Sequence, residues 1–180
     1  MQDLVEILAE VSKRLEALSI PYMLTGGLAQ HYYAIERTTA DVDLVMELEI
    51  KDVPRFVAEF DRDFYVPKEL AISAVRKRSE FNIIHLQSVI KVDCIVKKNS
   101  EYAETAFQRR QPAEVAGAKT FVASKEDLIL SKLEWAKKSE SDRQMHDLRN
   151  LLSTGYDETY VKSWAERLGV TGLLARCLGE

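Results

Sequence analysis

The chain has 180 residues, of which 46% are hydrophobic and 30% charged, as expected for a globular protein with a core of its own. Its 25 basic and 29 acidic residues give a net charge of −4, which argues against bulk electrostatic coating of nucleic acid but permits a local basic groove. With only Cys94 and Cys177, we expect a reduced, cytoplasmic protein. The N-terminal stretch "MQDLVEILAEVSKRL" carries acids, so we expect neither a signal peptide nor a membrane anchor.

Helices and strands alternate in the first two thirds of the chain. Apolar residues recur at helical spacing over 3–18, and Pro21 forbids continuation of that helix. The apolar run ending at Leu24 indicates a strand, and the glycines that follow it indicate a tight turn into a short helix over 28–35. Further helices are expected over 52–60, 68–77 and 100–109, and strands over 41–46, 63–66, 81–86, 89–96 and around "TFVAS".

The last third of the chain is predicted to be mostly helical. Ser124 and Asp127 have the spacing of a capping box before "EDLILSKLEWAKK". Three more helices are expected over 142–152, 157–168 and 171–178, and Trp135 and Trp164 are expected to pack helices together. The fold class is therefore α/β in the broad (α+β) sense, with an α/β core over 1–123 and a C-terminal helical region over 124–180.

Two acidic residues mark the strand over 41–46. Asp41 and Asp43 are two positions apart, so their side chains share one face of the strand while the apolar residues between and after them face the core. Two neighbouring carboxylates repel each other unless a cation lies between them, and Mg²⁺ prefers such oxygen ligands. Acid-x-acid pairs also arise by chance, as at 47–49 and 61–63, so a third acid is needed to strengthen the interpretation.

Asp93 is a candidate for that third acid. It lies in the largely apolar segment "SVIKVDCIVKK", where a charge is costly to bury unless it is paired or coordinated. If this strand lies beside the strand over 41–46, three carboxylates converge and could hold one or two divalent ions for phosphoryl chemistry. The alternative is an ion pair between Asp93 and Lys91 or a nearby arginine.

The residues before Asp41 are candidates for phosphate contacts. Gly26 and Gly27 permit positive φ and a close approach of the backbone to a ligand, although they could form only a tight turn. No Gly-Lys-Ser/Thr follows them, so this is not a P-loop. Arg37 and Thr38, with the next threonine, could add contacts or form a solvated loop. Three short basic runs could line an RNA groove or be solvated surface: 76–78, 97–98 and 109–110.

These motifs together resemble the DNA polymerase β-type nucleotidyltransferase superfamily. Thirteen residues (28–40) separate the glycine pair from Asp41-Val42-Asp43, and "GGLAQHYYAIERTTADVDL" is similar to small bacterial members with an Arg-x-Thr-x-Asp-h-Asp motif, where h is apolar. The segment "SKEDLILSKLEWAKKSESDRQMHDLRNLL" resembles the bacterial AbiEii-type branch. There a lysine and an acid on successive helices complete the site; Lys132 and Asp147 match them, with Asp142 competing for the acidic position.

The resemblance implies a mixed sheet flanked by helices and followed by a helical region. It also implies transfer of a nucleoside monophosphate from an NTP to an acceptor hydroxyl, dependent on Mg²⁺ or Mn²⁺. Asp41 and Asp43 would bind metal, and Asp93 would lie near the attacking hydroxyl as a metal ligand or base. Gly26 and Gly27 would contact phosphate through their backbone, and Lys132 would reach the triphosphate.

The branch suggests a toxin that modifies tRNA or a protein, with an antitoxin partner. No membrane association is expected from the N-terminal stretch. An aminoglycoside-type acceptor is a further possibility, because the superfamily includes such enzymes. Two other functions stay open at this stage. One is a nucleotide-binding or antitoxin-like partner that uses the fold without turnover, and the other is an unrelated α/β protein whose acids form ion pairs.

Overall fold

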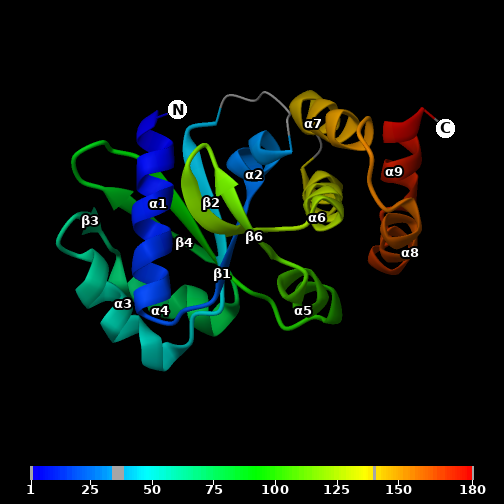
Figure 1. Ribbon diagram of the computed structural model, residues 1–180. Coiled ribbons are helices and arrows are strands. Elements are labelled where there is room, and N and C mark those ends of the chain that lie inside the picture. The colour runs from blue at the N-terminus through cyan, green and yellow to red at the C-terminus, as the bar shows by residue number, and fades with distance from the viewer. Residues whose placement is uncertain (1, 34–38, 140, 180) are drawn as a thin grey trace.

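The computed structural model describes residues 2–33, 39–139 and 141–179, in which a mixed sheet is flanked by helices (Figure 1). The strands pair in the order β3-β4-β5-β2-β1-β7-β6. They are β1 (Tyr22–Thr25), β2 (Asp41–Met46), β3 (Phe64–Tyr65), β4 (Glu80–His85), β5 (Lys91–Val96), β6 (Gln111–Val115) and β7 (Ala118–Val122). The sheet confirms the predicted α/β class.

Most helices agree closely with the predicted ranges, with two exceptions. The helix expected over 28–35 begins earlier, because Gly26 and Gly27 form its first turn directly after β1 instead of a separate tight turn, and positions 34–35 lie outside the described residues. The helix expected over 52–60 is preceded by a 3-10 turn, η1 (Ile50–Asp52). The helices are α1 (Gln2–Ala17), α2 (Gly26–Tyr32), α3 (Val53–Phe60), α4 (Lys68–Lys77), α5 (Glu101–Gln108), α6 (Lys125–Lys138), α7 (Asp142–Leu152), α8 (Glu158–Leu168) and α9 (Thr171–Leu178). Within the described residues, no helix is both long enough and apolar enough to cross a membrane.

Strand β2 lies at the centre of the sheet. It pairs in parallel with β5 and antiparallel with β1. Val42, Leu44 and Met46 are fully buried, whereas the alternate residues Asp41 and Asp43 are only half-buried. This alternation follows from the period of two along a strand. It leaves one face of β2 to the core, and the other face carries Asp41 and Asp43 together with Val45.

Helix α1 covers the core side of the sheet, where it packs against β7 and β2. Its buried stripe includes Leu8, Val11 and Leu15, and burying a leucine or valine side chain contributes about 1.5–3 kcal/mol. The one buried polar group on that stripe is satisfied, because Ser12 Oγ lies 3.0 Å from Thr120 Oγ1. The central strands are thereby fixed from the side opposite to their acidic face.

Helices α6 to α9 gather on the side of the molecule away from α3 and α4 (Figure 1). Ser124 caps α6 as predicted, since its Oγ accepts a hydrogen bond from Asp127 N at 3.2 Å. Buried residues of these helices, such as Leu133 and Leu148, belong to the same hydrophobic cluster as the sheet. The division into separate units at residue 123 stays a prediction.

Candidate active site

The two acidic strands lie side by side. Because β2 and β5 pair in parallel register, Asp43 is the direct partner of Asp93, and Asp41 is the partner of Lys91. Neighbouring strands are about 4.8 Å apart and registered side chains point to the same face. The sequence-based expectation that β5 lies beside β2, with its acid on the same face, is confirmed.

Lys91 lies between two of the three acids. Its Nζ donates a hydrogen bond to Asp93 Oδ2 at 3.1 Å and is 3.6 Å from Asp41 Oδ2. Burial lowers the pKa of Lys91, but the hydrogen bond to Asp93 and the charges of both carboxylates outweigh it, so its pKa lies above its ordinary value. The alternative of an ion pair with Asp93 therefore holds, and Lys91 is a permanent cation within the acidic face.

Asp93 is more enclosed than Asp41. The exposed fraction of its side chain is 20%, against 39% for Asp41. Its Oδ1 is buried and has no hydrogen-bond partner among the residues that the structure describes. Over the same ranges, no three or more His, Cys, Asp or Glu side chains gather closely enough to hold a metal ion. The three carboxylates therefore share a face without forming one metal-binding cluster.

Gly26 and Gly27, the first residues of α2, lie directly against Asp43. Gly26 has φ of +64°, and a Cβ placed on it would lie 2.0 Å from Asp43 Oδ2. The backbone N–H of Gly27 donates a long hydrogen bond of 3.4 Å to the same oxygen. Only glycine combines this positive φ with this close approach. The pair therefore fixes where the Asp43 carboxylate lies, while its contact with phosphate stays a prediction.

The segment before β2 is described only from Thr39 onward. Arg37 and Thr38, the predicted phosphate contacts, lie outside the described residues. Thr39 Oγ1 donates to the backbone oxygen of Asp41 at 3.3 Å, and a Cβ on Gly27 would lie 2.6 Å from it. Thr39 thus contacts both the start of α2 and the first residue of β2.

A cavity of about 400 Å³ opens above this face, between the sheet and the C-terminal helices. That volume lies in the range of small-molecule sites. One wall, from α2 and β2, includes Gly26, Gly27, Asp41 and Asp43, and the wall from α6 and α7 includes Lys132, Trp135 and Asp147. Six of the nine predicted site residues therefore line one cavity, and among the described candidates only Asp93 is not part of its lining.

The structure joins Lys132 and Asp147 across α6 and α7. Lys132 Nζ is 3.2 Å from Asp147 Oδ2, and both side chains are largely buried, with exposed fractions of 13% and 7%. Asp142, the competing candidate, is exposed in the first turn of α7. The acid that faces the lysine is therefore Asp147, which is expected because position 142 lies more than one helical turn away.

Trp135 differs from the expectation that it packs helices together. It lies at the cavity with 59% of its surface exposed, whereas Trp164 is buried as expected. The available signal was its place three residues after Lys132, which puts both side chains on one face of α6. An exposed indole at a cavity offers a flat apolar surface for stacking.

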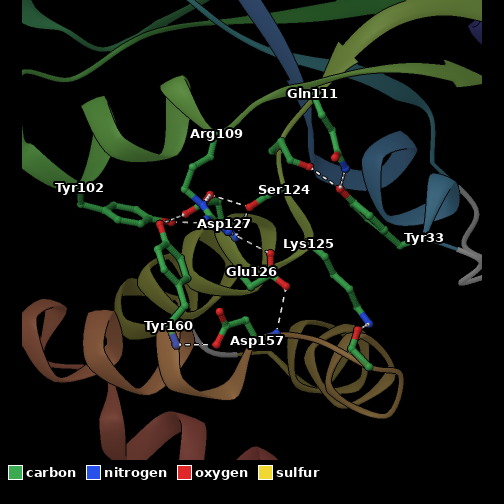
Figure 2. Close-up of polar contacts among 12 residues, drawn as sticks. Tyr33, Tyr102, Arg109, Gln111, Ser124, Lys125, Glu126, Asp127, Asp157 and Tyr160 are labelled. Atoms are coloured by element: carbon green, nitrogen blue, oxygen red, sulfur yellow. Dashed lines mark hydrogen bonds and ion pairs between the residues drawn. The ribbon is translucent and has the colours of Figure 1, made fainter.

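A buried carboxylate at the start of α6 ties three helices together beside the cavity. Asp127 Oδ2 accepts hydrogen bonds from Ser124 Oγ at 2.6 Å and Arg109 Nε at 3.0 Å, and its Oδ1 accepts one from Tyr160 Oη at 2.8 Å (Figure 2). Arg109 also stacks 3.9 Å above the Tyr160 ring. Burial and then the bond to Asp127 raise the pKa of Tyr160. Figure 2 thus shows one hydrogen-bonded junction between α6, α8 and the end of α5.

Two of the basic runs also have structural roles. Arg109 belongs to the junction around Asp127. Lys97 is buried, pairs with Glu47 Oε1 at 2.5 Å, and also pairs with Glu104. These side chains compensate acids of the protein itself, which favours structural roles over an RNA groove at both positions.

The donor set at the cavity suits a hard divalent ion. Mg²⁺ in phosphoryl-transfer sites takes one or two carboxylates together with phosphate and water oxygens. Asp41 and Asp43 supply two carboxylates on one face of β2, and both line the cavity. The orphaned Oδ1 of Asp93 lies on the neighbouring strand. The residues present therefore fit one Mg²⁺ or Mn²⁺ ion held by Asp41 and Asp43.

No protein-family model and no curated protein sequence matches the chain. Solved structures do resemble it. ANT(2")-Ia in complex with adenylyl-2"-tobramycin has a TM-score of 0.61 at 17% identity, covering 98% of each chain. An antigenic nucleotidyltransferase-like protein from Paracoccidioides brasiliensis has a TM-score of 0.57 at 17% identity, covering 99% of this chain and 93% of the other.

The lincosamide antibiotic adenylyltransferase LnuA, with lincomycin bound, has a TM-score of 0.55 at 13% identity over 80% of this chain and 93% of its own. At these identities, the likeness establishes the fold. The chain has the nucleotidyltransferase-type fold predicted from its motifs.

Proposed function

We propose that this protein is a nucleotidyltransferase, which moves a nucleoside monophosphate from an NTP to an acceptor hydroxyl with the help of Mg²⁺ or Mn²⁺. One observation carries the proposal. Parallel pairing of β2 and β5 puts Asp43 in register with Asp93, and Asp41 and Asp43 line a cavity together with the glycine turn. Nucleotidyltransferase-type neighbours support the same reaction class.

The chemistry requires charge neutralisation and positioning more than covalent catalysis. The divalent ion, when bound, supplies positive charge to the triphosphate oxygens. The acceptor oxygen forms a bond to the α-phosphorus, the bond from that phosphorus to the bridging oxygen breaks, and pyrophosphate leaves with the electron pair. Asp41 and Asp43 would hold the ion. Asp93, beside Asp43, takes the proton of the attacking hydroxyl.

The opposite wall of the cavity would bind the rest of the nucleotide. Lys132, held by Asp147 at 3.2 Å, contributes positive charge toward the triphosphate. Trp135, with its exposed indole, offers a stacking surface, and base–aromatic stacking contributes about 1–3 kcal/mol. Gly26 and Gly27 let the phosphate chain approach the backbone. Arg37 and Thr38 remain proposed phosphate contacts from the segment before β2.

The acceptor is proposed to be a hydroxyl of tRNA or of a protein, as in a toxin controlled by an antitoxin. A small-molecule acceptor is the second candidate, because structural neighbours are described with adenylyl-tobramycin and with lincomycin. The two classes predict different products. A labelled macromolecule supports the first candidate, and a labelled small molecule supports the second.

The test uses each NTP labelled at the α-phosphate, incubated with the protein and Mg²⁺ in total RNA, in a protein extract, and with an aminoglycoside panel. We expect label to move to an acceptor with the wild-type chain. Asp43→Ala should abolish transfer while the far-ultraviolet circular dichroism stays unchanged. Asp61→Ala is the matched control, because that exposed acid belongs to the other Asp-x-Asp pair.

Two results would count against the proposal. Metal-dependent NTP binding without transfer to any acceptor would favour a nucleotide-binding partner that uses the fold without turnover. Loss of folding in Asp43→Ala would instead assign the aspartate a structural role, as in an unrelated α/β protein.

A further inference from the structure

We propose that Lys91 takes the place of a second divalent cation, so that the site binds a single metal ion. The inference rests on the proposed function, because it concerns how that same site is charged. It starts from the position of the ammonium group between Asp41 and Asp93. A site with three carboxylates on neighbouring strands otherwise suits two ions.

The geometry makes Lys91 an internal counter-ion. Its Nζ is 3.1 Å from Asp93 Oδ2 and 3.6 Å from Asp41 Oδ2, so one ammonium contacts two carboxylates on different strands. The register explains why, since Lys91 is the β5 partner of Asp41 and lies two residues before Asp93 on the same face. Two registered strands thus place a cation and three acids on one face of the sheet.

Charge balance then limits the number of ions. The carboxylates of Asp41 and Asp93 are stabilised by a cation between them. The side chain of Lys91 supplies that positive charge as a permanent part of the protein. A second divalent ion at Asp93 would meet one oxygen, Oδ2, that already accepts the lysine hydrogen bond, and another, Oδ1, that is buried. It would also lie beside a fixed ammonium, at a repulsive distance.

Lys91 would also contribute to the reaction. A fixed positive charge beside Asp93 would stabilise the negative charge that develops on the attacking oxygen. In two-metal sites, one of the metal ions has this role. Lysine suits this role because its ammonium is a compact point charge. Its half-buried position keeps the charge less screened than at an open surface.

The experiment counts ions on the intact chain. Equilibrium dialysis measures Mn²⁺ retained per chain in the presence of a saturating NTP analogue with a methylene group between its α- and β-phosphates. We expect one ion for wild type and two for Lys91→Met. Lys91→Arg, which keeps a cation, should retain one. Lys98→Met is the matched control, because Lys98 is an exposed lysine at the same cavity, and it should also retain one.

A second measurement covers the case in which Lys91→Met folds poorly. Removal of the ammonium leaves Asp41 and Asp93 uncompensated, so Mn²⁺ should raise the Tm of Lys91→Met more than that of wild type. Two ions on wild type, or one ion and an equal Tm rise on Lys91→Met, would overturn the inference and leave the proposed function standing. Failure of wild type to retain any Mn²⁺ with the analogue would overturn both.

Discussion

Gly26 and Asp43 approach so closely that the smallest side chain on the glycine would collide with the carboxylate. A Cβ on Gly26 would lie 2.0 Å from Asp43 Oδ2 and 2.4 Å from Asp43 Cγ. The start of α2, directly after β1, therefore fixes the position of the β2 aspartate. This contact follows from the sheet pairing, because β1 and β2 are antiparallel partners and Thr25 pairs with Asp43.

Gly26→Ala should abolish metal-dependent NTP binding. The new methyl group would displace the Asp43 carboxylate, and alanine at φ of +64° is strained, so we expect a loss of about 1–3 kcal/mol in the free energy of unfolding. Binding is measured by isothermal titration with Mg²⁺-NTP, and stability by urea unfolding. Gly172→Ala is the control, because a Cβ there meets nothing within 4 Å. Unchanged binding by Gly26→Ala would refute this role of the turn.

Much of this arrangement could be predicted from local patterns. The alternation in "DVDLVM" gave the bounds of β2 and the face of its acids, which the structure reproduces as Asp41–Met46. The apolar segment around Asp93 gave β5 in the same way. Pairing of β2 with β5 could only be proposed, because strand order depends on contacts between segments distant in the chain.

Other features could not be predicted because they depend on tertiary contacts. The sequence does not predict strand β6, "QPAEV". Pro112 is unfavourable within a strand, and because the strand is mostly exposed, it needs no apolar pattern that could reveal it. It forms because β7 offers an antiparallel partner at the sheet edge. Likewise, the exposure of Trp135 depends on how α6 and α7 pack, which helical periodicity alone does not reveal.

The ion pair between Lys132 and Asp147 can be separated into structural and binding roles. Lys132→Met and Asp147→Leu should each lower the free energy of unfolding by about 1–3 kcal/mol, because each removes one member of a largely buried ion pair. The double variant should lose less than the sum of the two. Its affinity for Mg²⁺-NTP should nevertheless stay at least about ten-fold weaker than wild type, because a ten-fold change needs only about 1.4 kcal/mol.

Urea unfolding and isothermal titration on the four chains complete this cycle. Recovery of nucleotide affinity in the double variant would mean that Lys132 acts only through packing of α6 against α7. Lys137→Met is a suitable control on the same helix, because that side chain is exposed and contacts the backbone oxygen of Leu168 instead.

Tyr160→Phe tests the junction at Asp127. The change removes one hydrogen bond of 2.8 Å to a buried carboxylate and keeps the aromatic ring under Arg109. Hydrogen bonds to charged groups contribute about 1.5–3 kcal/mol, and we expect a loss of that order in urea unfolding. Tyr65→Phe, at an exposed tyrosine, should change little. Equal stability of the two variants would show that the junction does not depend on the hydroxyl.

Tyr33 should make the protein sensitive to alkaline pH. Its hydroxyl donates to the backbone oxygen of Ala123 at 2.7 Å and accepts from Gln111 at 3.1 Å (Figure 2). Burial is the main cause that raises the pKa of Tyr33 to about 12, from an ordinary value of 10.0. The folded chain therefore keeps the neutral phenol while the unfolded chain loses its proton. The stability from this group is complete below pH 10 and is lost as the pH rises toward 12.

The measurement is the urea midpoint at about pH 9 and about pH 11 for wild type, Tyr33→Phe and Tyr32→Phe. Wild type should lose stability between the two values, and Tyr33→Phe should lose less, because phenylalanine has no proton to release. Tyr32→Phe controls for the loss of a neighbouring, exposed hydroxyl and should follow wild type. Other buried tyrosines such as Tyr102 also have a raised pKa, so the informative quantity is the difference between variants. An equal fall for wild type and Tyr33→Phe would show that Tyr33 ionises no later in the folded chain than in the unfolded one.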